Sequence, residues 1–401
     1  MRILHVIASL APRYGGPSAV APEMARVLTA RGHHVEILTT DVDGSQRLQV
    51  PMARQVEWRG AATTFFRVHW PRPYAASTGL AAALRRRVRE FDVVHVHSLY
   101  LFHTQAAGHY CRRLSTPYIL RPHGVLDPYH RARHRWRKAV YTTLLERRSI
   151  AGAAGLHFTS TMEREHAEPL RLGVPGFVVP LGVDAGELQR PRAAEQLFQW
   201  HPRLAGRVLV TYVGRLARKK RLDLLVDAFA MVARAHPDAH LVIAGPDDER
   251  EGSRLRAQLA QLGLSGRASL PGLVNRELKA ALLQHSSVFV LPSEDENLGV
   301  SVVEAMAVGL PVVVTEGVAI HREIAGAGAG LIVPPAGPAL SEALFRLLED
   351  RAASTATGRN GRALAESVFD WNAIAPQLER MYALAIGRSP DRPVPGGGGA
   401  Q

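Results

Sequence analysis

The chain has 401 residues, of which 46% are hydrophobic and 21% charged. This length and apolar content are enough for two ordinary domains, each with its own core, and they exclude global disorder. The single cysteine, Cys111, excludes a disulfide framework and a cysteine-based zinc site, and it agrees with a reducing compartment.

The net charge of +13 is distributed unevenly. Residues 1–150 contain 23 Lys and Arg against 9 Asp and Glu, whereas the remaining 251 residues contain 26 against 27. Such asymmetry indicates an anionic partner of the first part of the chain: a membrane surface, a nucleic acid or an acidic substrate. The alternative is a set of solvated surface arginines.

No apolar run approaches the roughly 18–20 residues of a transmembrane helix. The first residues, "MRILHVIASL", lack the cleavage site of a signal peptide and are typical of a buried first strand. We therefore expect a cytoplasmic protein.

Short β-branched runs alternate with helical patterns along the whole chain. The first series of predicted strands comprises residues 2–8, 33–40, 63–68, 92–97, 117–124, 155–160 and 176–183, and the second comprises 207–216, 239–246, 267–274, 287–293, 311–317 and 330–335. Predicted helices include 17–31, 222–235, 249–262, 276–284 and 302–308. The alternation predicts parallel sheets covered by helices, and the two series predict two doubly wound α/β domains that join near residues 185–206.

Several loops follow predicted strands, where ligands of open α/β sheets bind. Gly15 and Gly16 follow the first strand and allow close approach of the backbone to a ligand, although a plain turn is the alternative. They do not form a G-x-G-x-x-G fingerprint, so dinucleotide binding is disfavoured. Arg215 and Lys220 follow the first strand of the second series at a helix entry, which suits a pyrophosphate. One or both of the neighbouring Arg218 and Lys219 are interpreted as solvated.

The stretch from Glu296 to Val314 has two glutamates eight residues apart. Glu296 is on a predicted loop, and Glu304 is on the first turns of the helix that follows. Backbone N–H groups at this helix entry can hold phosphate or sugar hydroxyls. Glu296 is a candidate acceptor for sugar hydroxyls, and Glu304 for two vicinal ribose hydroxyls. A carboxylate that only complements the helix dipole is the alternative.

These blocks together resemble one family. "ENLGVSVVEAMAVGLPVV" resembles the E-x7-E signature of the retaining family 4 glycosyltransferases of GT-B fold, and "VGRLARKKRLDLLVDAF" resembles their diphosphate-binding loop. The blocks "GGPSAV", "RPHGVLDP", "AGLHFTSTMEREH", "VPLGVD" and "FDWNAIAPQLERMYALA" resemble the remaining family motifs in the same order. Leu181 departs from the usual Asn and Asn297 from a frequent Gly. We expect Asn297 to accommodate a left-handed turn.

The resemblance implies a GT-B architecture of two Rossmann-like domains that face each other across a cleft. An acceptor-side domain is expected over residues 1–185, a nucleotide-sugar-binding domain over 186–368, and a C-terminal helix that crosses back to the first domain over 369–386. The Pro- and Gly-rich residues 387–401 are expected to be a disordered tail.

The resemblance also implies retaining transfer of a sugar from a nucleoside-diphosphate sugar to a saccharide or polyprenyl-linked acceptor, in polysaccharide or glycolipid biosynthesis. No cofactor and no obligatory metal are expected. The expected catalytic residues are His123, Arg215, Lys220 and Glu296. The expected donor-binding residues are Gly15, Gly16, Arg215, Lys220, Gly245, Leu273, Glu296, Asn297, Leu298, Gly299 and Glu304.

His123 is expected either to hydrogen-bond a donor-sugar hydroxyl or to stabilise positive charge near the anomeric carbon, and Asp127 is a weaker candidate on the same loop. Backbone groups around Gly245 and residues 270–274 are expected to contact the base. "DVD" at residues 41–43 is interpreted as a solvated loop and not as a Mg²⁺ site.

Residues 129–148 predict a basic amphipathic helix that either lies on an anionic bilayer or packs its apolar stripe into the core. The first reading would place a peripheral enzyme at the inner face of the cell membrane. Two other functions stay open: an epimerase or phosphorylase of the same fold, and a basic nucleic-acid-binding protein. The second is disfavoured because aromatic residues make up only 6% of the chain and no base-reading motif is present.

Overall fold

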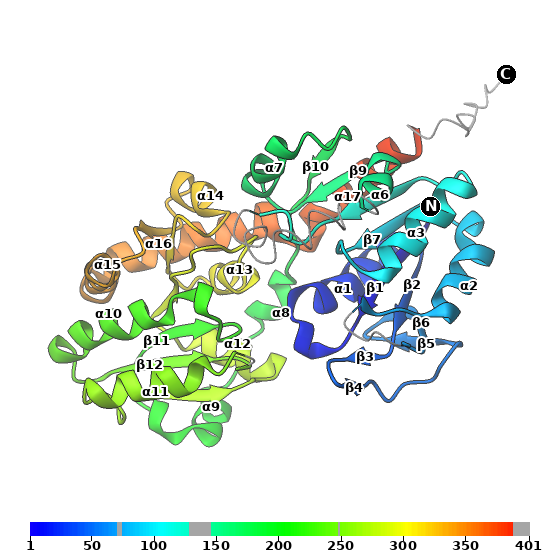
Figure 1. The fold of residues 1–401 in the computed structure, drawn as a ribbon. Helices are drawn as coiled ribbons and strands as arrows, with labels where there is room; N and C mark the ends of the chain where they lie inside the picture. The colour runs from blue at the N-terminus through cyan, green and yellow to red at the C-terminus, as the bar shows by residue number, and fades with distance from the viewer. Residues whose placement is uncertain (70–73, 128–145, 248, 388–401) are drawn as a thin grey trace. The chain divides into compact units, whose positions relative to one another are not determined.

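The computed structural model describes residues 1–69, 74–127, 146–247 and 249–387. They form two compact units, each built around its own sheet (Figure 1). Unit 1 contains Met1–Pro180 and the chain from Ile374 onward, and unit 2 contains Leu181–Ala373. Unit 2 begins slightly before the join placed at residue 185, and Val183 already forms a β-bridge with Asp370 of the same unit.

The sheet of unit 1 has eight strands in the order β10-β9-β8-β7-β1-β2-β6-β5. Neighbouring strands pair in parallel except β5, which is antiparallel to β6. The bounds are β1 (Arg2–Ser9), β2 (His34–Thr40), β5 (Gln55–Trp58), β6 (Ala61–Phe66), β7 (Val93–His97), β8 (Tyr118–Arg121), β9 (Gly155–Phe158) and β10 (Gly176–Val178). A separate hairpin joins β3 (Val42–Asp43) to β4 (Gln46–Arg47).

The central strand of this sheet, β1, is apolar because helices cover it. Ile3, Leu4 and Val6 have no exposed surface, as expected for a parallel strand that is buried on both faces. The described helices of unit 1 are α1 (Gly16–Ala30), α2 (Thr78–Arg87), α3 (Phe102–Arg113), α6 (Arg147–Ala151) and α7 (Thr161–Ala167).

The last helix, α17 (Trp371–Gly387), begins in unit 2 and continues into unit 1. Its buried side chains recur every three or four residues, which is the spacing of one helix face. They are Trp371, Ile374, Ala375, Leu378, Met381, Tyr382 and Ala385. Between them, Glu379 accepts hydrogen bonds of 2.6 and 2.9 Å from the guanidinium of Arg31. The helix is therefore a structural part of unit 1.

Unit 2 contains a parallel sheet of six strands in the order β13-β12-β11-β14-β15-β16. Its strands are β11 (Val208–Val213), β12 (Ala239–Ala244), β13 (Ala268–Gly272), β14 (Val288–Leu291), β15 (Val312–Thr315) and β16 (Gly330–Val333). Its helices are α8 (Ala185–Gln189), α9 (Ala194–Trp200), α10 (Leu222–Ala235), α11 (Glu251–Gln261), α12 (Arg276–Gln284), α13 (Val300–Ala307), α14 (His321–Gly326), α15 (Gly337–Glu349) and α16 (Arg351–Leu364).

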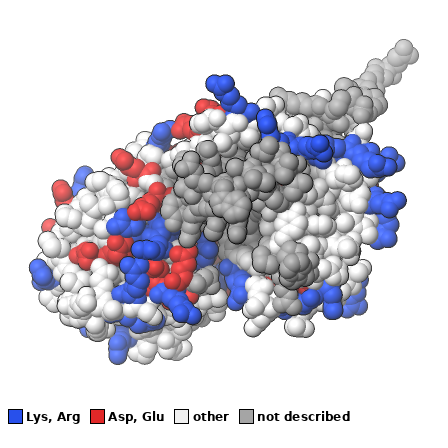
Figure 2. Space-filling model, viewed as in Figure 1, with Lys and Arg blue, Asp and Glu red and all other residues white. Residues whose placement is uncertain are grey.

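The prediction of two doubly wound α/β sheets is confirmed. The predicted helix over residues 129–148 lies mostly outside the described residues. None of the described helices is both long and apolar enough to cross a membrane. On the face drawn in Figure 2, basic and acidic side chains alternate over unit 2, whereas the described part of unit 1 shows mainly basic ones.

Candidate active site

Two loops of unit 2 leave the sheet where its strand order changes direction. Strand β11 comes first in the chain, yet it lies between β12 and β14. The loops after β11 and β14 therefore leave adjacent strand ends at the switch point, which is where open α/β sheets bind ligands. The Glu294 N–H donates to the Lys219 carbonyl at 2.8 Å, and the Ser293 hydroxyl donates to the same oxygen at 3.1 Å. The two loops are thus fixed to each other.

The first loop carries the predicted cations Arg215 and Lys220. Arg215 is exposed, and its guanidinium makes no hydrogen bond or ion pair with the described side chains. Lys220 ends a short 3₁₀ turn (Arg218–Lys220), is only 9% exposed, and contacts the Glu296 carboxylate. The sequence prediction gave Lys220 no acidic partner, because Glu296 is distant in the chain.

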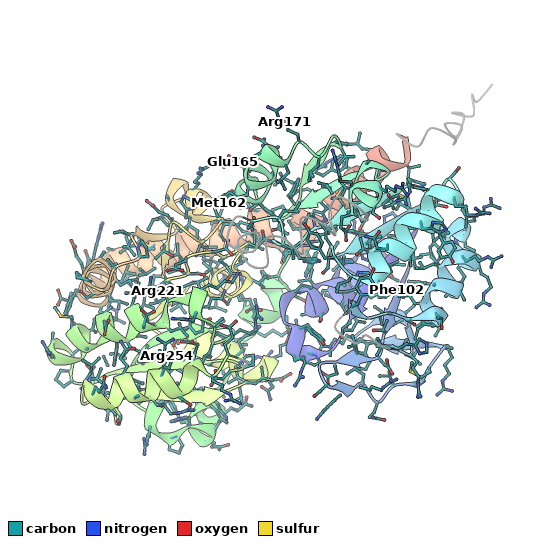
Figure 3. The ribbon with its side chains drawn as sticks, viewed as in Figure 1. Phe102, Met162, Glu165, Arg171, Arg221 and Arg254 are labelled. Atoms are coloured by element: carbon teal, nitrogen blue, oxygen red, sulfur yellow. The ribbon has the colours of Figure 1, made fainter. Side chains whose placement is uncertain are left out.

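Of the two neighbouring cations, Arg218 is exposed, whereas Lys219 is half-buried. Lys219 forms an ion pair of 3.1 Å with the buried Asp295. Arg221, which is labelled in Figure 3, directly precedes α10 in the left-handed region at φ 49°, and it pairs with Asp223 and Glu294. These pairs join the loop after β11 to the loop after β14, and only the three-dimensional fold brings them together.

Burial lowers the pKa of Lys220 to about 7, and the cations of Lys219 and Arg215 act in the same direction. The carboxylate of Asp295 opposes this effect. A buried ammonium among other cations gains free energy when a dianion binds, because the dianion restores the charge balance. The loop is therefore electrostatically suited to a diphosphate.

The loop that carries Glu296 is held by the end of the neighbouring strand β15. The Glu296 N–H donates to the Gly317 carbonyl at 2.8 Å, and the Ala319 N–H donates to the Glu296 carbonyl at 3.0 Å. Gly299 precedes α13 at φ 80°, a conformation that glycine adopts without strain. The expectation of a left-handed Asn297 is wrong, because Gly299 supplies the left-handed residue of this loop. Leu298 is buried beneath it.

Glu304 lies on the second turn of α13, and its carboxylate contacts the Lys279 ammonium on α12. Both side chains are partly buried, with exposed fractions of 15% and 24%. Sequence analysis predicted the α12 helix correctly but missed Lys279 as a site residue. Nothing in the local pattern indicates that this lysine faces α13. Both glutamates of the signature are therefore paired with a lysine.

Gly245 and Leu273, the expected base contacts, lie at the ends of β12 and β13. Gly245 has φ 149°, and a Cβ there would lie 1.8 Å from the Gly214 carbonyl oxygen. The position therefore requires glycine, and this glycine keeps the loop after β12 close to the loop after β11. Leu273 is 72% exposed, which is unusual for a large apolar side chain.

The remaining predicted donor contacts, Gly15 and Gly16, are in unit 1. Both follow β1 at the entry of α1. Gly15 has φ 70°, so it requires glycine for backbone reasons, whereas Gly16 has ordinary dihedrals. A Cβ on either residue would meet no atom within 4 Å. The backbone here is therefore open to a ligand.

His123 follows β8 in unit 1 and is itself left-handed, with φ 56°. Its Nε2 lies 3.2 Å from Nδ1 of His97. Burial lowers its pKa well below the ordinary value, and Arg121 acts in the same direction. A side chain with positive φ is uncommon and is often associated with function. Asp127, the weaker candidate, is buried and pairs with His166 at 3.2 Å.

The "DVD" stretch is not a solvated loop, which corrects the sequence interpretation. Asp41 is 2% exposed, accepts from the Val68 N–H at 2.7 Å and pairs with Arg47 at 3.1 Å. Asp43 pairs with Arg13 at 3.1 Å. Both carboxylates therefore hold unit 1 together.

Two family profiles match this chain. The Glycosyltransferase Family 4 profile matches residues 14–187, and the profile of Glycosyl transferases group 1 matches residues 195–364. The two matches follow each other along the chain and together cover most of it.

The chain is also similar to curated proteins. The phosphatidyl-myo-inositol mannosyltransferase of Mycobacterium leprae is 28% identical over 400 residues, which cover 92% of each chain. The alpha-D-kanosaminyltransferase of Streptomyces kanamyceticus is 29% identical over 180 residues, and this match spans 45% of this chain and about half, 46%, of that relative.

Among solved structures, the sucrose-phosphate synthase from Thermosynechococcus elongatus superposes with a TM-score of 0.79 at 23% identity, over 97% of this chain and 100% of that one. At this identity the likeness shows the fold, which is GT-B. Because two consecutive profiles and the fold agree, the chain belongs to the group 1, family 4 glycosyltransferases of GT-B fold.

Proposed function

We propose that the protein is a retaining glycosyltransferase. It transfers a sugar from a nucleoside-diphosphate sugar to a saccharide or lipid-linked acceptor, in the synthesis of a polysaccharide or glycolipid. The observation that supports this most is the pair of tied loops at the switch point of the unit 2 sheet. These loops bring two cations and the first of two carboxylates to adjacent strand ends.

In this proposal, each group of unit 2 has one role. Arg215 and Lys220 bind the diphosphate and stabilise the charge that develops on it as the glycosidic bond breaks. Glu304 accepts the vicinal ribose hydroxyls, and Glu296 orients the sugar together with the backbone N–H groups at Gly299. The loops after β12 and β13, at Gly245 and Leu273, contact the base.

In unit 1, Gly15 and Gly16 offer open backbone to the donor, and His123 hydrogen-bonds the transferred sugar. The leaving phosphate takes the acceptor proton, so catalysis consists mainly of positioning and charge stabilisation. Arg215 and Lys220 supply the positive charge at the diphosphate, and we propose that the reaction needs neither a metal ion nor a cofactor.

A lipid-linked acceptor agrees with the charge distribution and with the name of the mycobacterial relative, a mannosyltransferase of phosphatidyl-myo-inositol. The +14 excess of residues 1–150 would favour an anionic bilayer, which is where such an acceptor resides. We therefore propose a cytoplasmic enzyme that docks peripherally at the inner face of the membrane.

The donor is identified by thermal unfolding with UDP, GDP or ADP. One of the three nucleotides is expected to raise the melting temperature, because a ligand at a hundred times its dissociation constant adds about 2.7 kcal/mol of stability. Alanine at Arg215 or Lys220 should abolish this rise. A protein that none of the nucleotides stabilises would contradict the proposed donor site.

The same-fold alternatives differ in product. A sugar-nucleotide epimerase returns an isomerised donor, whereas a transferase forms a glycoside and a free nucleoside diphosphate. A phosphorylase leaves the nucleotide sugar unchanged, because it forms a sugar phosphate from a glycan and inorganic phosphate. Chromatography of the products from the stabilising donor separates the three, and NMR of the anomeric proton of the glycoside tests retention.

A further inference from the structure

The core of unit 1 contains a group of histidines that lie on one side of its sheet. His5 on β1 and His95 on β7 are partners in the strand register, and His97 follows two residues after His95. His157 is on β9, and all four side chains have no exposed surface. They form two hydrogen-bonded chains, and one of them ends at His123.

The polarity of the inner chain is fixed by a backbone carbonyl. His157 Nε2 lies 2.7 Å from the Val179 carbonyl oxygen, so this nitrogen must carry the proton and donate. The bare His157 Nδ1 then accepts from His95 Nε2–H at 3.3 Å, and the bare His95 Nδ1 accepts from the Tyr382 hydroxyl at 2.8 Å. Both histidines of this chain therefore have a defined tautomer.

The outer chain joins His5, His97 and His123. His5 Nδ1 lies 2.8 Å from His97 Nε2, and His97 Nδ1 lies 3.2 Å from His123 Nε2. The His5 and His97 rings are inclined by 26°, and the His97 and His123 rings by 28°. The rings of each pair are therefore nearly parallel, with centroids 5.2 and 5.4 Å apart.

Neutral imidazoles in this outer chain have only two consistent arrangements. A neutral ring carries one N–H, so each ring that donates through one nitrogen accepts through the other. Either all three rings are protonated at Nδ1, with donation running from His5 to His123, or all three are protonated at Nε2, with donation running back. Burial lowers the pKa of His5, His97 and His123 below the ordinary value, which supports neutral rings.

The innermost nitrogen decides between the two arrangements. His5 Nε2 is buried and has no partner among the described residues. In the Nε2–H arrangement it would be a buried donor without an acceptor, whereas in the Nδ1–H arrangement it is a bare lone pair. Orphaned buried N–H groups are rarer in proteins than orphaned acceptors.

We propose that His97 is a positioning residue that holds His123 in its Nδ1–H tautomer by donating a hydrogen bond to His123 Nε2. His123 then presents a hydrogen-bond donor, Nδ1–H, and acts neither as a base nor as an acceptor that stabilises positive charge. This inference rests on the proposed function for what the donor contacts, which is an oxygen of the transferred sugar.

The backbone of His123 is held as firmly as its ring. Gly124 is also left-handed at φ 76°, and its N–H donates to the buried Glu163 carboxylate at 2.7 Å. The other oxygen of Glu163 accepts from Thr159 N–H and hydroxyl at 2.7 and 3.0 Å. A residue with positive φ persists only when its surroundings over-determine it. Both the backbone and the tautomer of His123 are therefore preset.

A metal ion is the competing interpretation of the cluster. One ligand nitrogen from each of His5, His95 and His97 lies within 4.8 Å of the others. A cation there would break the hydrogen bonds of both chains. It would also be added near the fully buried guanidinium of Arg121, with no carboxylate among its ligands. The neutral hydrogen-bonded chain avoids both costs.

The decisive experiment compares two amides at His97. An Asn amide reaches the position of Nδ1, and a Gln amide reaches the position of Nε2. H97N can therefore still donate to His123, whereas H97Q keeps only the contact to His5. ¹⁵N NMR of histidine-labelled protein distinguishes the tautomers directly. We expect the Nδ1–H form of His123 in the wild-type protein and in H97N, and a mixture of tautomers in H97Q.

Turnover is measured as nucleoside diphosphate release from UDP-glucose or GDP-mannose, according to the nucleotide that stabilises the protein. We expect H97Q to lower kcat about tenfold, as one hydrogen bond allows, with little change in KM. H97N should stay near the wild-type value. H240Q, at a buried histidine of unit 2, controls for the loss of a ring.

An Nε2–H tautomer of His123 in the wild-type protein, or equal turnover of H97N and H97Q, would overturn the proposal. A stoichiometric metal in the purified protein that H97Q loses would overturn it as well. The H123A variant distinguishes the proposed function of His123 from the positioning role of His97. Wild-type turnover in H123A contradicts the proposed function of His123, whereas low turnover in H123A with normal turnover in H97Q contradicts only the positioning role.

Discussion

Lys220 contacts the Glu296 carboxylate, and Lys279 contacts the Glu304 carboxylate. In the ligand-free protein each carboxylate already has a cationic partner, so neither is held in place by the ligand alone. Each pair restricts the rotamers of both of its side chains. The glutamates are therefore oriented before a nucleotide sugar arrives.

Glu304→Ala is expected to weaken nucleoside diphosphate binding by about 1.5–3 kcal/mol, the value of a hydrogen bond to a charged group. The reason is the loss of the ribose acceptor. Titration calorimetry with the stabilising nucleotide measures the change, and Glu277→Ala on the exposed side of α12 is the control. Unchanged affinity in Glu304→Ala would show that the carboxylate serves only Lys279.

Lys279→Met is expected to weaken the same binding by less than Glu304→Ala does. The methionine keeps the apolar stem of the side chain but removes the charge that orients Glu304. A gain in affinity would show instead that Lys279 competes with the ribose for the carboxylate. Melting temperatures of both variants report any effect on folding.

The lowered pKa of Lys220 predicts how folding stability and nucleotide binding depend on pH. Its pKa of about 7 in the folded protein lies below its unfolded value, so the folded protein releases this proton first. Burial of the charged form therefore costs stability in full below about pH 7, and this cost decreases as the pH rises from the folded pKa towards the higher pKa of the unfolded chain. A bound diphosphate favours the charged form and raises the pKa again.

Nucleotide binding at pH 8 is therefore expected to take up a proton and to weaken as the pH rises further. Calorimetry in two buffers of different ionisation enthalpy measures the uptake. Lys220→Met should abolish it. Proton-neutral binding by the wild-type protein would mean that the Glu296 contact keeps Lys220 charged throughout.

At the scale of elements, the helices α10 and α12 begin and end where the sequence predicts, because their apolar periodicity is strong and clear. In α10, Leu225, Val226, Phe229 and Val232 are buried at the spacing of one helix face. The short strands β3, β4 and β5 were missed, since two to four residues carry no periodicity. The order of the strands is a long-range property that a local pattern does not contain.

Some residues of the candidate site could be predicted from the sequence, and others could not. Sequence motifs indicate Arg215, Lys220, Glu296 and Glu304, because these residues follow strands or begin helices. The ion pairs of Lys219 with Asp295 and of Lys279 with Glu304 could not be predicted, because each contact joins segments that are far apart in the chain. The histidine chains depend on which strands are neighbours in the sheet and were missed for that reason.

Gly245→Ala tests the close approach of the loop after β12 to the loop after β11. A Cβ would overlap the Gly214 carbonyl, and φ 149° is unfavourable for any side chain. Such strain costs on the order of 1–3 kcal/mol, so we expect a lower melting temperature and weaker nucleotide binding. Gly266→Ala is the matched control, since a Cβ at Gly266 meets nothing within 4 Å. Equal stability of the two variants would contradict the role of Gly245.

At the scale of the whole molecule, the charge excess of residues 1–150 predicts reversible docking to anionic bilayers. Each Lys or Arg near such a surface contributes about 1 kcal/mol, so several are sufficient without a membrane-spanning helix. We expect sedimentation with phosphatidylserine vesicles but not with phosphatidylcholine vesicles. Replacing Arg131, Arg135 and Lys138 by Glu should release the protein and leave nucleotide binding intact. Equal sedimentation with both vesicles would remove the membrane proposal.

The path of α17 also affects how the protein is made. Unit 1 comprises the first 180 residues, yet its core needs the side chains of the last helix, including the Tyr382 hydroxyl that begins the inner histidine chain. On the ribosome, unit 1 therefore cannot complete its core until the whole of unit 2 has been synthesised. Domains usually fold in the order in which they emerge. In this chain the unit that emerges first is completed last, and its exposed core is the segment that a nascent-chain chaperone would have to protect.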